Sequence, residues 1–335
     1  MKYLFELSKE HHTLPTAEIA ACLKAENVTY SIIEENEDVL IIETDVKEEN
    51  IKQVVNRLSL TFYINEFLFS CQPDSEQIAK KAIEHPIGKE GSIAIHCKRR
   101  STTVDSHPIV KALAKIYTKN RRVILKHPDI EVRGFITDSN IYTGVKIAEI
   151  NRSQFEQRKV QHRPFFSPIS LHPKLARALV NLSAIQKGGT LLDPFCGTGG
   201  ILLKAGLIGA QVIGSDVEQK MIDGCKKTLD FYNVEKHEIF CSDIGDISSH
   251  VTEVDSIVTD LPYGKATTTK GENIIQLYER AFENISNVLK KRGRAVIGLS
   301  NKNMLSIGER YFSLLEQHEW KAHRSLTRYF VVYQK

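Results

Sequence analysis

The chain has 335 residues, a formal net charge of +4 and a hydrophobic fraction of 41%. This length predicts two or three domains, and the hydrophobic fraction is sufficient for packed cores. No apolar run approaches the roughly 18 residues needed to cross a bilayer, and the N-terminus lacks the residue order of a signal peptide, so we expect a cytoplasmic protein without a membrane segment. The six scattered cysteines contain no CxxC pair, which predicts reduced thiols and no metal site.

The positive charge is concentrated in the middle of the chain. Residues 1–50 carry a net charge of −8, residues 51–165 carry +9 and residues 166–335 carry +3. A basic segment between an acidic and a nearly neutral one predicts that an anionic polymer docks there, because clustered surface charge attracts a polyelectrolyte of opposite sign.

The first segment, residues 1–50, alternates short apolar strands with short helices. The order β-α-β-β-α is typical of a small ferredoxin-like α+β domain. Pro15 is expected in the first turn of a helix, where its missing N–H is not needed. We expect strands over residues 3–7, 30–33 and 39–43, and helices over residues 15–26 and 48–58.

The second segment, residues 51–148, carries bunched basic side chains. One cluster follows a strand expected to end at residue 97, and another flanks a strand expected over residues 123–126. Such clusters are often only a solvated rim, but two of them within residues 51–165, which carry a net charge of +9, favour contact with a phosphate backbone. The candidate RNA-binding residues are Lys98, Arg99, Arg100, Arg121, Arg122 and Lys126. The other expected elements are helices over residues 75–84 and 108–118 and strands over residues 92–97, 131–137 and 140–147.

The stretch VILKHPDIEVRGFI, residues 123–136, resembles the THUMP domain, an RNA-binding module of tRNA-modifying enzymes. The matching features are a strand, a Pro-Asp turn and a second strand. The resemblance implies that residues 51–148, with their ferredoxin-like neighbour, hold the acceptor end of a tRNA. Residues 149–167 are polar and lack clear periodicity, which predicts a linker.

Residues 168–335 are expected to form the catalytic domain. From Thr190 onward they repeat a unit of apolar strand, polar tip and helix, the pattern of a Rossmann-like, doubly wound parallel α/β sheet. The strands expected over residues 190–193, 211–216, 238–243 and 256–260 each end in an aspartate. Any one of these residues could simply cap the next helix. Four in succession predict a shared crevice, because ligands bind at the carboxyl ends of such strands. The four residues are Asp193, Asp216, Asp243 and Asp260.

The glycine-rich loop DPFCGTGG, residues 193–200, indicates a cofactor site. Its glycines permit a tight turn, as in dinucleotide-binding loops, and Asp216 could hold a ribose diol. Asp193 at the mouth of the loop would repel a pyrophosphate and attract a ligand with an ammonium and a sulfonium, which favours S-adenosylmethionine over NAD. Asp243 is expected to accept a hydrogen bond from the adenine amino group. The candidate cofactor-binding residues are Asp193, Phe195, Gly197, Gly199, Asp216, Val217, Asp243 and Ile244, together with Pro168 and Ser170 upstream.

The tetrapeptide Asp260-Leu261-Pro262-Tyr263 resembles the (Asp/Asn/Ser)-Pro-Pro-(Tyr/Phe/Trp) signature of amino-methyltransferases, with Leu261 in place of the first proline. An exocyclic amino group on a base is a weak nucleophile, because its lone pair is delocalised into the ring. Asp260 and the Leu261 carbonyl would accept hydrogen bonds from this amino group and localise the lone pair. Pro262 would fix the loop and Tyr263 would stack on the flipped-out base. The alternative is a strand-ending aspartate followed by a proline turn and a core tyrosine.

The remaining residues predict the end of the sheet. We expect a helix over residues 273–290, a strand over 294–300, a helix over 304–317 and an antiparallel pair over 322–328 and 329–334. These elements complete a seven-stranded methyltransferase sheet. The Thr- and Lys-rich segment 265–272 is expected to form a loop over the substrate.

Three motifs together, FSPISLHPKLARALVNLS, DPFCGTGG and DLPYG, resemble those of the archaeal tRNA (guanine-10-N2)-dimethyltransferases, and the resemblance covers nearly the whole chain. It implies S-adenosylmethionine-dependent transfer of one or two methyl groups to N2 of a tRNA guanosine. Some relatives need a small zinc-containing activator subunit.

The alternatives are methylation of another guanine in tRNA or rRNA, a DNA adenine-N6 or cytosine-N4 methyltransferase, and a non-enzymatic RNA-binding protein. The absence of a target-recognition insert argues against DNA, and the intact acids argue against a non-enzyme.

Overall fold

The computed structural model describes residues 1–167, 170–263, 272–323 and 326–335. Contacts divide the chain into two units. The N-terminal unit comprises Met1–His12, Val28–Val55 and Thr61–Ile150, and the C-terminal unit comprises Thr13–Asn27, Asn56–Leu60 and Asn151–Lys335. These bounds differ from the four segments expected from sequence, because two stretches of the first 60 residues pack with the C-terminal unit.

The first of these stretches is helix α1, Leu14–Ala25, which packs against helix α6, Pro173–Leu182. The fully buried carboxylate of Glu18 fixes this contact. It accepts hydrogen bonds from the backbone and hydroxyl of Ser59, from the Leu60 N–H and from the Asn181 amide on α6, at 2.6–3.2 Å. A local sequence pattern predicts a helix here but cannot show which core the helix joins.

The N-terminal unit contains one continuous seven-stranded sheet that includes strands from both predicted N-terminal segments. All neighbouring strands are antiparallel except β5 and β6, which are parallel. The central strand β4 was not expected from sequence. Its polar residues Asn65 and Glu66 interrupt the apolar pattern, although the Asn65 side chain is buried. The strand order is β2 (Ser31–Glu35), β3 (Val39–Glu43), β1 (Lys2–Leu7), β4 (Thr61–Cys71), β7 (Ile141–Glu149), β6 (Ile130–Ile136) and β5 (Ile93–Arg99).

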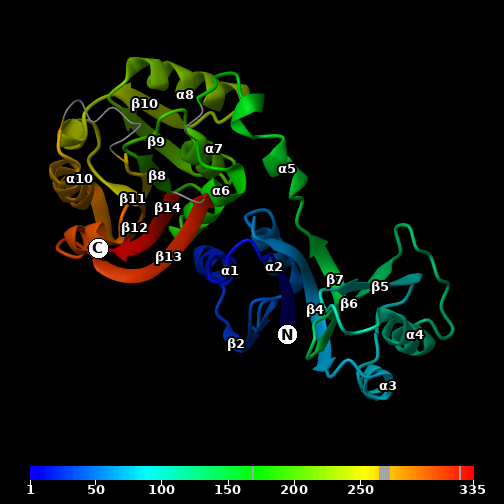
Figure 1. The fold of residues 1–335 in the computed structure, drawn as a ribbon. Helices are drawn as coiled ribbons and strands as arrows, with labels where there is room; N and C mark the ends of the chain where they lie inside the picture. Colours follow the sequence, from blue (N-terminus) through cyan, green and yellow to red (C-terminus); the bar gives the residue numbers. More distant parts are fainter. Residues whose placement is uncertain (168–169, 264–271, 324–325) are drawn as a thin grey trace. The chain divides into compact units, whose positions relative to one another are not determined.

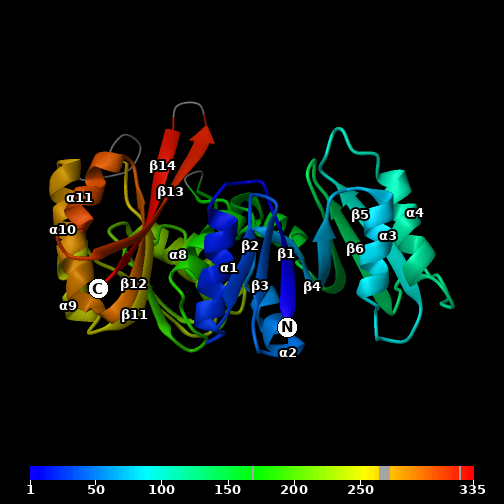
Figure 2. The same cartoon turned by 90° about the horizontal axis from the view of Figure 1, so that it is seen from below.

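Helices α3, Ser75–Glu84, and α4, Ser106–Tyr117, lie side by side (Figure 2), with α3 against β4 and α4 against β5. Each helix begins after an aspartate, Asp74 or Asp105, whose side chain accepts hydrogen bonds from the first turn. Helix α2 covers Glu48–Val55. The strand expected over residues 123–126 is wrong: Val123 forms only an isolated bridge to Ile93. Val123 and Leu125 are 54% and 68% exposed, so their side chains face solvent and do not join a core.

The C-terminal unit confirms the predicted seven-stranded α/β sheet. Five neighbouring strands pair in parallel, and β14 lies antiparallel between β12 and the edge strand β13. Figure 1 shows that helices α6, α7 and α8 cover one face of this sheet and that α10 lies on the other, where α9 and α11 also pack. The strand order is β10 (His237–Cys241), β9 (Gln211–Asp216), β8 (Thr190–Asp193), β11 (Val254–Asp260), β12 (Leu289–Leu299), β14 (Leu326–Gln334) and β13 (Ser313–His323). The helices are α7 (Gly200–Gly206), α8 (Gln219–Phe231), α9 (Ile247–His250), α10 (Ile274–Val288) and α11 (Leu305–Gly308).

The helix expected over residues 304–317 is wrong. Only the short turns Lys302–Met304 and Leu305–Gly308 are helical, and strand β13 begins at Ser313. From Glu316 to Trp320 burial alternates between neighbouring residues, as in a strand with one face covered. Strand β13 therefore ends at His323 and β14 begins at Leu326, earlier than the expected boundary between strands at residues 328–329.

The segment expected to be a linker contains two short helical pieces, α5 (Ser153–Glu156) and a 3₁₀ turn at Val160–His162. Phe155 is fully buried and Arg163 is 6% exposed, so both side chains pack inside the C-terminal unit. No helix in the described part of the chain is long and apolar enough to span a membrane.

Candidate active site

The carboxyl ends of the parallel strands border one cavity of about 490 Å³ in the C-terminal unit. Asp193 ends β8, Asp216 ends β9 and Asp260 ends β11, while Asp243 lies two residues after β10. All four carboxylates line this cavity. Its volume is in the range of pockets that enclose a cofactor-sized molecule. The expected crevice at the strand ends is therefore present.

The glycine-rich loop connects β8 to α7 with two residues in the left-handed region, Gly197 at φ 49° and Gly199 at φ 76°. A Cβ on Gly199 would lie 2.6 Å from the Cys225 sulfur, so only glycine fits there. Gly199 itself is not among the cavity-lining residues. Gly197 lines the cavity, and a Cβ on it would meet no atom within 4 Å. The backbone at Gly197 is therefore open to a ligand.

Asp193 lines the cavity and is only 1% exposed. One carboxylate oxygen, Oδ1, accepts hydrogen bonds from the Phe195 N–H at 3.2 Å and from the Thr259 hydroxyl at 2.7 Å. Burial raises the pKa of Asp193 to about 7, and the nearby carboxylates of Asp216 and Asp260 act in the same direction. Asp193 is thus a carboxylate that a bound cation would stabilise.

Asp216 is held by two backbone groups. Its Oδ2 accepts a hydrogen bond from the Gly197 N–H and its Oδ1 accepts one from the Glu218 N–H, each at 3.0 Å. Burial raises the pKa of Asp216 despite these bonds. Val217, the next residue, also lines the cavity. This arrangement orients the carboxylate at the strand end, beside the glycine-rich loop.

Asp243 forms an ion pair with Arg280 on α10, a residue that was not predicted from the sequence. Arg280 also forms an ion pair with Glu272 at 2.7 Å. Arg280 and Glu272 both line the cavity. Asp243 Oδ1 additionally accepts a hydrogen bond from the Gly245 N–H at 2.8 Å. The two carboxylates raise the pKa of Arg280. A ligand that bonds to Asp243 therefore meets an oxygen already shared with a guanidinium.

Asp260 is engaged through both of its oxygens. The Tyr263 hydroxyl donates a hydrogen bond to Oδ1, and Arg328 Nη1 on β14 lies 3.1 Å from Oδ2. The Arg328 guanidinium carbon lies 4.9 Å from the centre of the Tyr263 ring. Burial raises the pKa of Asp260, while Arg328 opposes this effect. Arg328 was not predicted, although it is the cation that faces the proposed catalytic carboxylate.

The neighbours of Asp260 keep the tetrapeptide in place. Leu261 is fully buried and its N–H donates to the Gly298 carbonyl at 3.0 Å. The Tyr278 hydroxyl on α10 donates to the Pro262 carbonyl at 3.0 Å. A Cβ on Gly298 would lie 2.2 Å from Asp260 Oδ1, so the neighbouring strand needs glycine there. All four residues of the tetrapeptide line the cavity.

The other predicted cofactor residues are placed differently. Phe195 and Ser170 line the cavity, whereas Ile244 is 2% exposed and belongs to the core between the sheet and α10. Pro168 and residues 265–271 of the expected substrate loop lie outside the described residues. Among the described residues, no group of three or more His, Cys, Asp or Glu side chains is placed to hold a metal ion.

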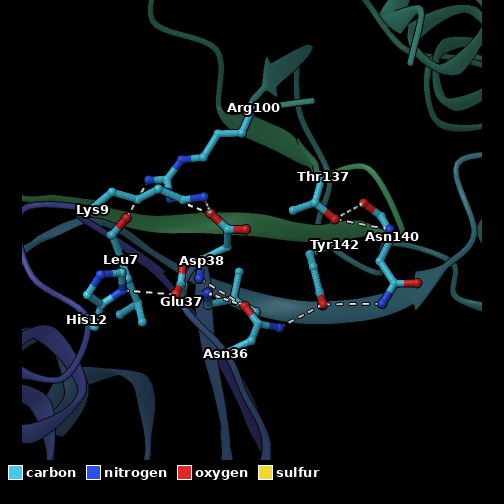
Figure 3. A network of polar contacts seen from close by, with 11 residues as sticks. Leu7, Lys9, His12, Asn36, Glu37, Asp38, Arg100, Thr137, Asn140 and Tyr142 are labelled. Carbon is cyan, nitrogen blue, oxygen red and sulfur yellow. Dashed lines mark hydrogen bonds and ion pairs between the residues drawn. The ribbon is translucent and has the colours of Figure 1, made fainter. Parts of the chain in front are cut away.

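The predicted RNA-binding residues divide into two kinds in the N-terminal unit. Arg100 donates to the Leu7 carbonyl, lies 2.6 Å from Asp38 Oδ1, and stacks 4.8 Å from the centre of the Phe135 ring. Figure 3 shows this guanidinium pointing into the polar network around Asp38. Arg121 donates to two backbone carbonyls, at 2.6 and 2.8 Å. The side chains exposed to solvent are Lys98, Arg99, Arg122 and Lys126.

Known proteins resemble the chain in sequence and in fold. The model of the RMKL-like methyltransferase domain family matches residues 161–329. A tRNA (guanine(10)-N2)-dimethyltransferase from Methanothermobacter thermautotrophicus is 32% identical over 338 residues, which cover 100% of both chains. The enzyme of the same name from Pyrococcus abyssi is 34% identical over 252 residues, 72% of this chain and 74% of its own.

Solved structures show the same fold at lower identity. TrmN from Thermus thermophilus matches with a TM-score of 0.57 and 19% identity, covering 100% of both chains. SMU.472, solved in complex with SAH, matches with a TM-score of 0.56 and 13% identity over 99% of this chain and 97% of its own. The family model covers half of the chain and a relative of equal length aligns from end to end. The chain belongs to the RMKL-like methyltransferase family, with the archaeal tRNA (guanine(10)-N2)-dimethyltransferases among its relatives.

Proposed function

We propose that this chain is an enzyme that methylates the exocyclic N2 amino group of guanosine 10 in tRNA, using S-adenosylmethionine, and that it adds one methyl group and then a second. The observation that supports this most directly is the position of Asp260. Its carboxylate, beside an aromatic ring and a proline turn, lines the same cavity as the glycine-rich loop and the other strand-end acids. Relatives of full length carry the name of this activity.

The residues present fit S-adenosylmethionine. The open space above Gly197 admits a ligand against the backbone, and the carboxylate of Asp193 gains stability from a ligand that carries positive charge. Asp216 would accept hydrogen bonds from the ribose hydroxyls, and Asp243 would accept one from the adenine amino group. The ligand, when bound, supplies a methyl group on a sulfonium, so the chain needs no nucleophile of its own.

The residues of the tetrapeptide prepare the amino group. Asp260 and the Leu261 carbonyl accept hydrogen bonds from N2, which localises its lone pair and aims it at the methyl carbon. In the free protein the Tyr263 hydroxyl occupies Asp260 Oδ1, so the arriving amino group replaces this hydrogen bond and frees the ring to stack on the base. Arg328 keeps Oδ2 in place and favours the ionised carboxylate, which accepts the N2 proton after transfer.

The N-terminal unit supplies the RNA contact in this proposal. Its middle segment resembles a THUMP domain, and Arg99 and Arg122 belong to an exposed basic set that also includes Lys98 and Lys126. These side chains would neutralise phosphates of the tRNA backbone. Arg100 and Arg121 would support the fold around that surface, because their guanidinium groups already bond within the unit. We propose the cytoplasm as the compartment in which the chain meets its tRNA substrate.

The test is methyl transfer by the purified chain alone, with labelled cofactor and tRNA, followed by mass spectrometry of the nucleosides. We expect N2-methylated guanosine at position 10. A tRNA that carries adenosine at position 10 should yield no N2-methylated guanosine from that position. The Asp260→Asn variant should lose about 10²- to 10⁴-fold in rate with cofactor affinity nearly unchanged. Asp246→Asn, an exposed acid nearby, is the matched control.

Three results would contradict parts of the proposal. Full activity of the Asp260→Asn variant would refute the role of the tetrapeptide. Methylation of DNA adenine or cytosine, or of another RNA guanine, in place of guanosine 10 would refute the substrate. Activity that depends on adding a zinc-containing activator subunit would show that the chain does not act alone.

A further inference from the structure

Three buried basic side chains meet beside helix α7 in the C-terminal unit, and each has donor atoms without a hydrogen-bond partner among the described residues. Lys204 is 0% exposed, Arg177 is 2% exposed and Arg163 is 6% exposed. The unsatisfied atoms are Lys204 Nζ, Arg163 Nη1 and Nη2, and Arg177 Nε. Buried charges are normally paired, because an unpaired one is strongly disfavoured away from water.

The three side chains share neighbours. Lys204 Nζ and the guanidinium carbon of Arg177 lie 5.8 and 6.0 Å from the centre of the Phe155 ring. Arg163 Nη1 lies 3.2 Å from the position of a Cβ on Gly200, which is one helical turn before Lys204 on α7. Residues four apart lie on the same face of a helix, so the Arg163 guanidinium and the Lys204 side chain occupy one face.

The described surroundings of the cluster lack a free acid. Glu18 is the carboxylate that acts on Arg177, and four donors of Ser59, Leu60 and Asn181 already occupy it. Burial, together with the nearby positive charges of Arg163, Arg177 and Arg158, lowers the pKa of Lys204 to about 6. At neutral pH Lys204 is therefore mostly a neutral amine beside two guanidinium groups that need an acceptor.

We propose that Lys204 is a site of carbamylation by carbon dioxide. The Nζ lone pair forms a bond to the carbon of CO2, one C=O electron pair moves onto oxygen, and one N–H proton leaves to the buffer. The product is a carbamate that carries one negative charge in place of the amine. Its two oxygens can accept from Arg163 Nη1 and Nη2, because a guanidinium pairs with a carboxylate-like group through two parallel bonds.

The environment favours this modification over other ways of supplying negative charge. Carbamylation requires a neutral amine, which this cluster produces, and CO2 is a small apolar molecule that can reach an interior site without an enzyme. A bound free anion would instead stabilise the protonated, positively charged form of Lys204, which does not react with CO2. The carbamate would join α7 to the segment around Arg163, which leads into the cavity residues Ser167 and Ser170. Carbamylation therefore stabilises the framework that carries the cofactor site, and it does not depend on which base is methylated.

The direct test is 13C NMR of the full chain equilibrated with 13C-labelled bicarbonate near neutral pH. We expect a protein carbamate resonance in stoichiometric amount that is absent from the Lys204→Met variant. Trapping the carbamate with a trialkyloxonium reagent, followed by peptide mass spectrometry, should locate the mass increase on Lys204. Lys220→Met, which removes an exposed lysine on α8, is the matched control and should keep the resonance. Absence of the resonance from the unmodified sequence, or its persistence in Lys204→Met, overturns the proposal.

Thermal unfolding gives a second measurement that does not depend on detecting the adduct. The unmodified sequence should melt about 2–4 °C higher in bicarbonate than in CO2-free buffer of equal ionic strength and pH. The Lys204→Glu variant carries a permanent carboxylate and should melt higher than Lys204→Met in both buffers, with no response to bicarbonate. Equal stabilisation of the unmodified sequence by chloride and bicarbonate would indicate a free anion and overturn the carbamate.

Discussion

Replacing Asp193 with asparagine should make the free protein more stable at alkaline pH. The pKa of Asp193 is raised to about 7 by burial, against an ordinary value of 3.8. The folded protein therefore holds a proton on this side chain that the unfolded chain releases above about pH 4. Asparagine keeps a similar shape and an oxygen for the Phe195 and Thr259 donors, but it never has to ionise.

The size of the effect follows from the two pKa values. Ionising Asp193 in the folded state costs about 4 kcal/mol more than in the unfolded chain once the pH is well above 7. At about pH 5 the cost is only about 1–2 kcal/mol, because the folded carboxyl is still protonated. The stability of Asp193→Asn relative to the unmodified sequence should therefore rise by about 3 kcal/mol between about pH 5 and about pH 8.5.

Urea unfolding at the two pH values provides the measurement, with fluorescence of the single tryptophan, Trp320, as the probe. Trp320 packs against the core of the C-terminal unit, so its signal reports on the same unit as Asp193. Glu235→Gln, an exposed acid, is the control and should show no pH trend. A stability difference that is the same at both pH values would refute a near-neutral pKa for Asp193.

Two further predictions concern the base site and the RNA surface. Replacing Arg328 with methionine should lower kcat about 10- to 100-fold and move the acid limb of its pH profile upward, because Asp260 loses the cation that favours its ionised form. Arg328→Lys should restore part of the rate, and an unchanged pH profile in the methionine variant would contradict the role of Arg328. Reversing the charge of Arg122 and Lys126 should weaken tRNA binding and reduce its salt dependence, whereas Arg100→Gln should mainly destabilise the N-terminal unit. A tRNA dissociation constant that the double reversal leaves unchanged would exclude contact of this surface with RNA.

The features that sequence predicted correctly are those set by neighbouring residues. The strand that ends at Asp216 and the loop around Gly197 follow from local apolar runs and from the need for left-handed backbone. The shared crevice followed from a topological rule, because parallel strands present their carboxyl ends at one edge. These arguments require no knowledge of which distant segments meet.

The features that sequence missed depend on distant partners. Arg328 meets Asp260 across 68 residues, and Arg280 meets Asp243 across 37 residues. The start of strand β13 was mistaken for a helix because the apolar residues Phe312, Leu314 and Leu315 fit either periodicity, and only pairing with β14 selects the strand. Arg100 looked like part of an exposed basic cluster, yet its neighbours Asp38 and Phe135 lie far from it in sequence.

The path of the chain between its two units has a consequence for synthesis on the ribosome. Helix α1 is made among the first residues, but α6, the helix it packs against, begins at Pro173. About 160 further residues must therefore be translated before the Asn181 amide, the last hydrogen-bond donor of the Glu18 carboxylate, is present. Until then an apolar helix surface stays uncovered on the nascent chain, where a chaperone can bind it. Cleavage after Ile150 would likewise leave the C-terminal unit without α1, because that helix would remain on the other fragment.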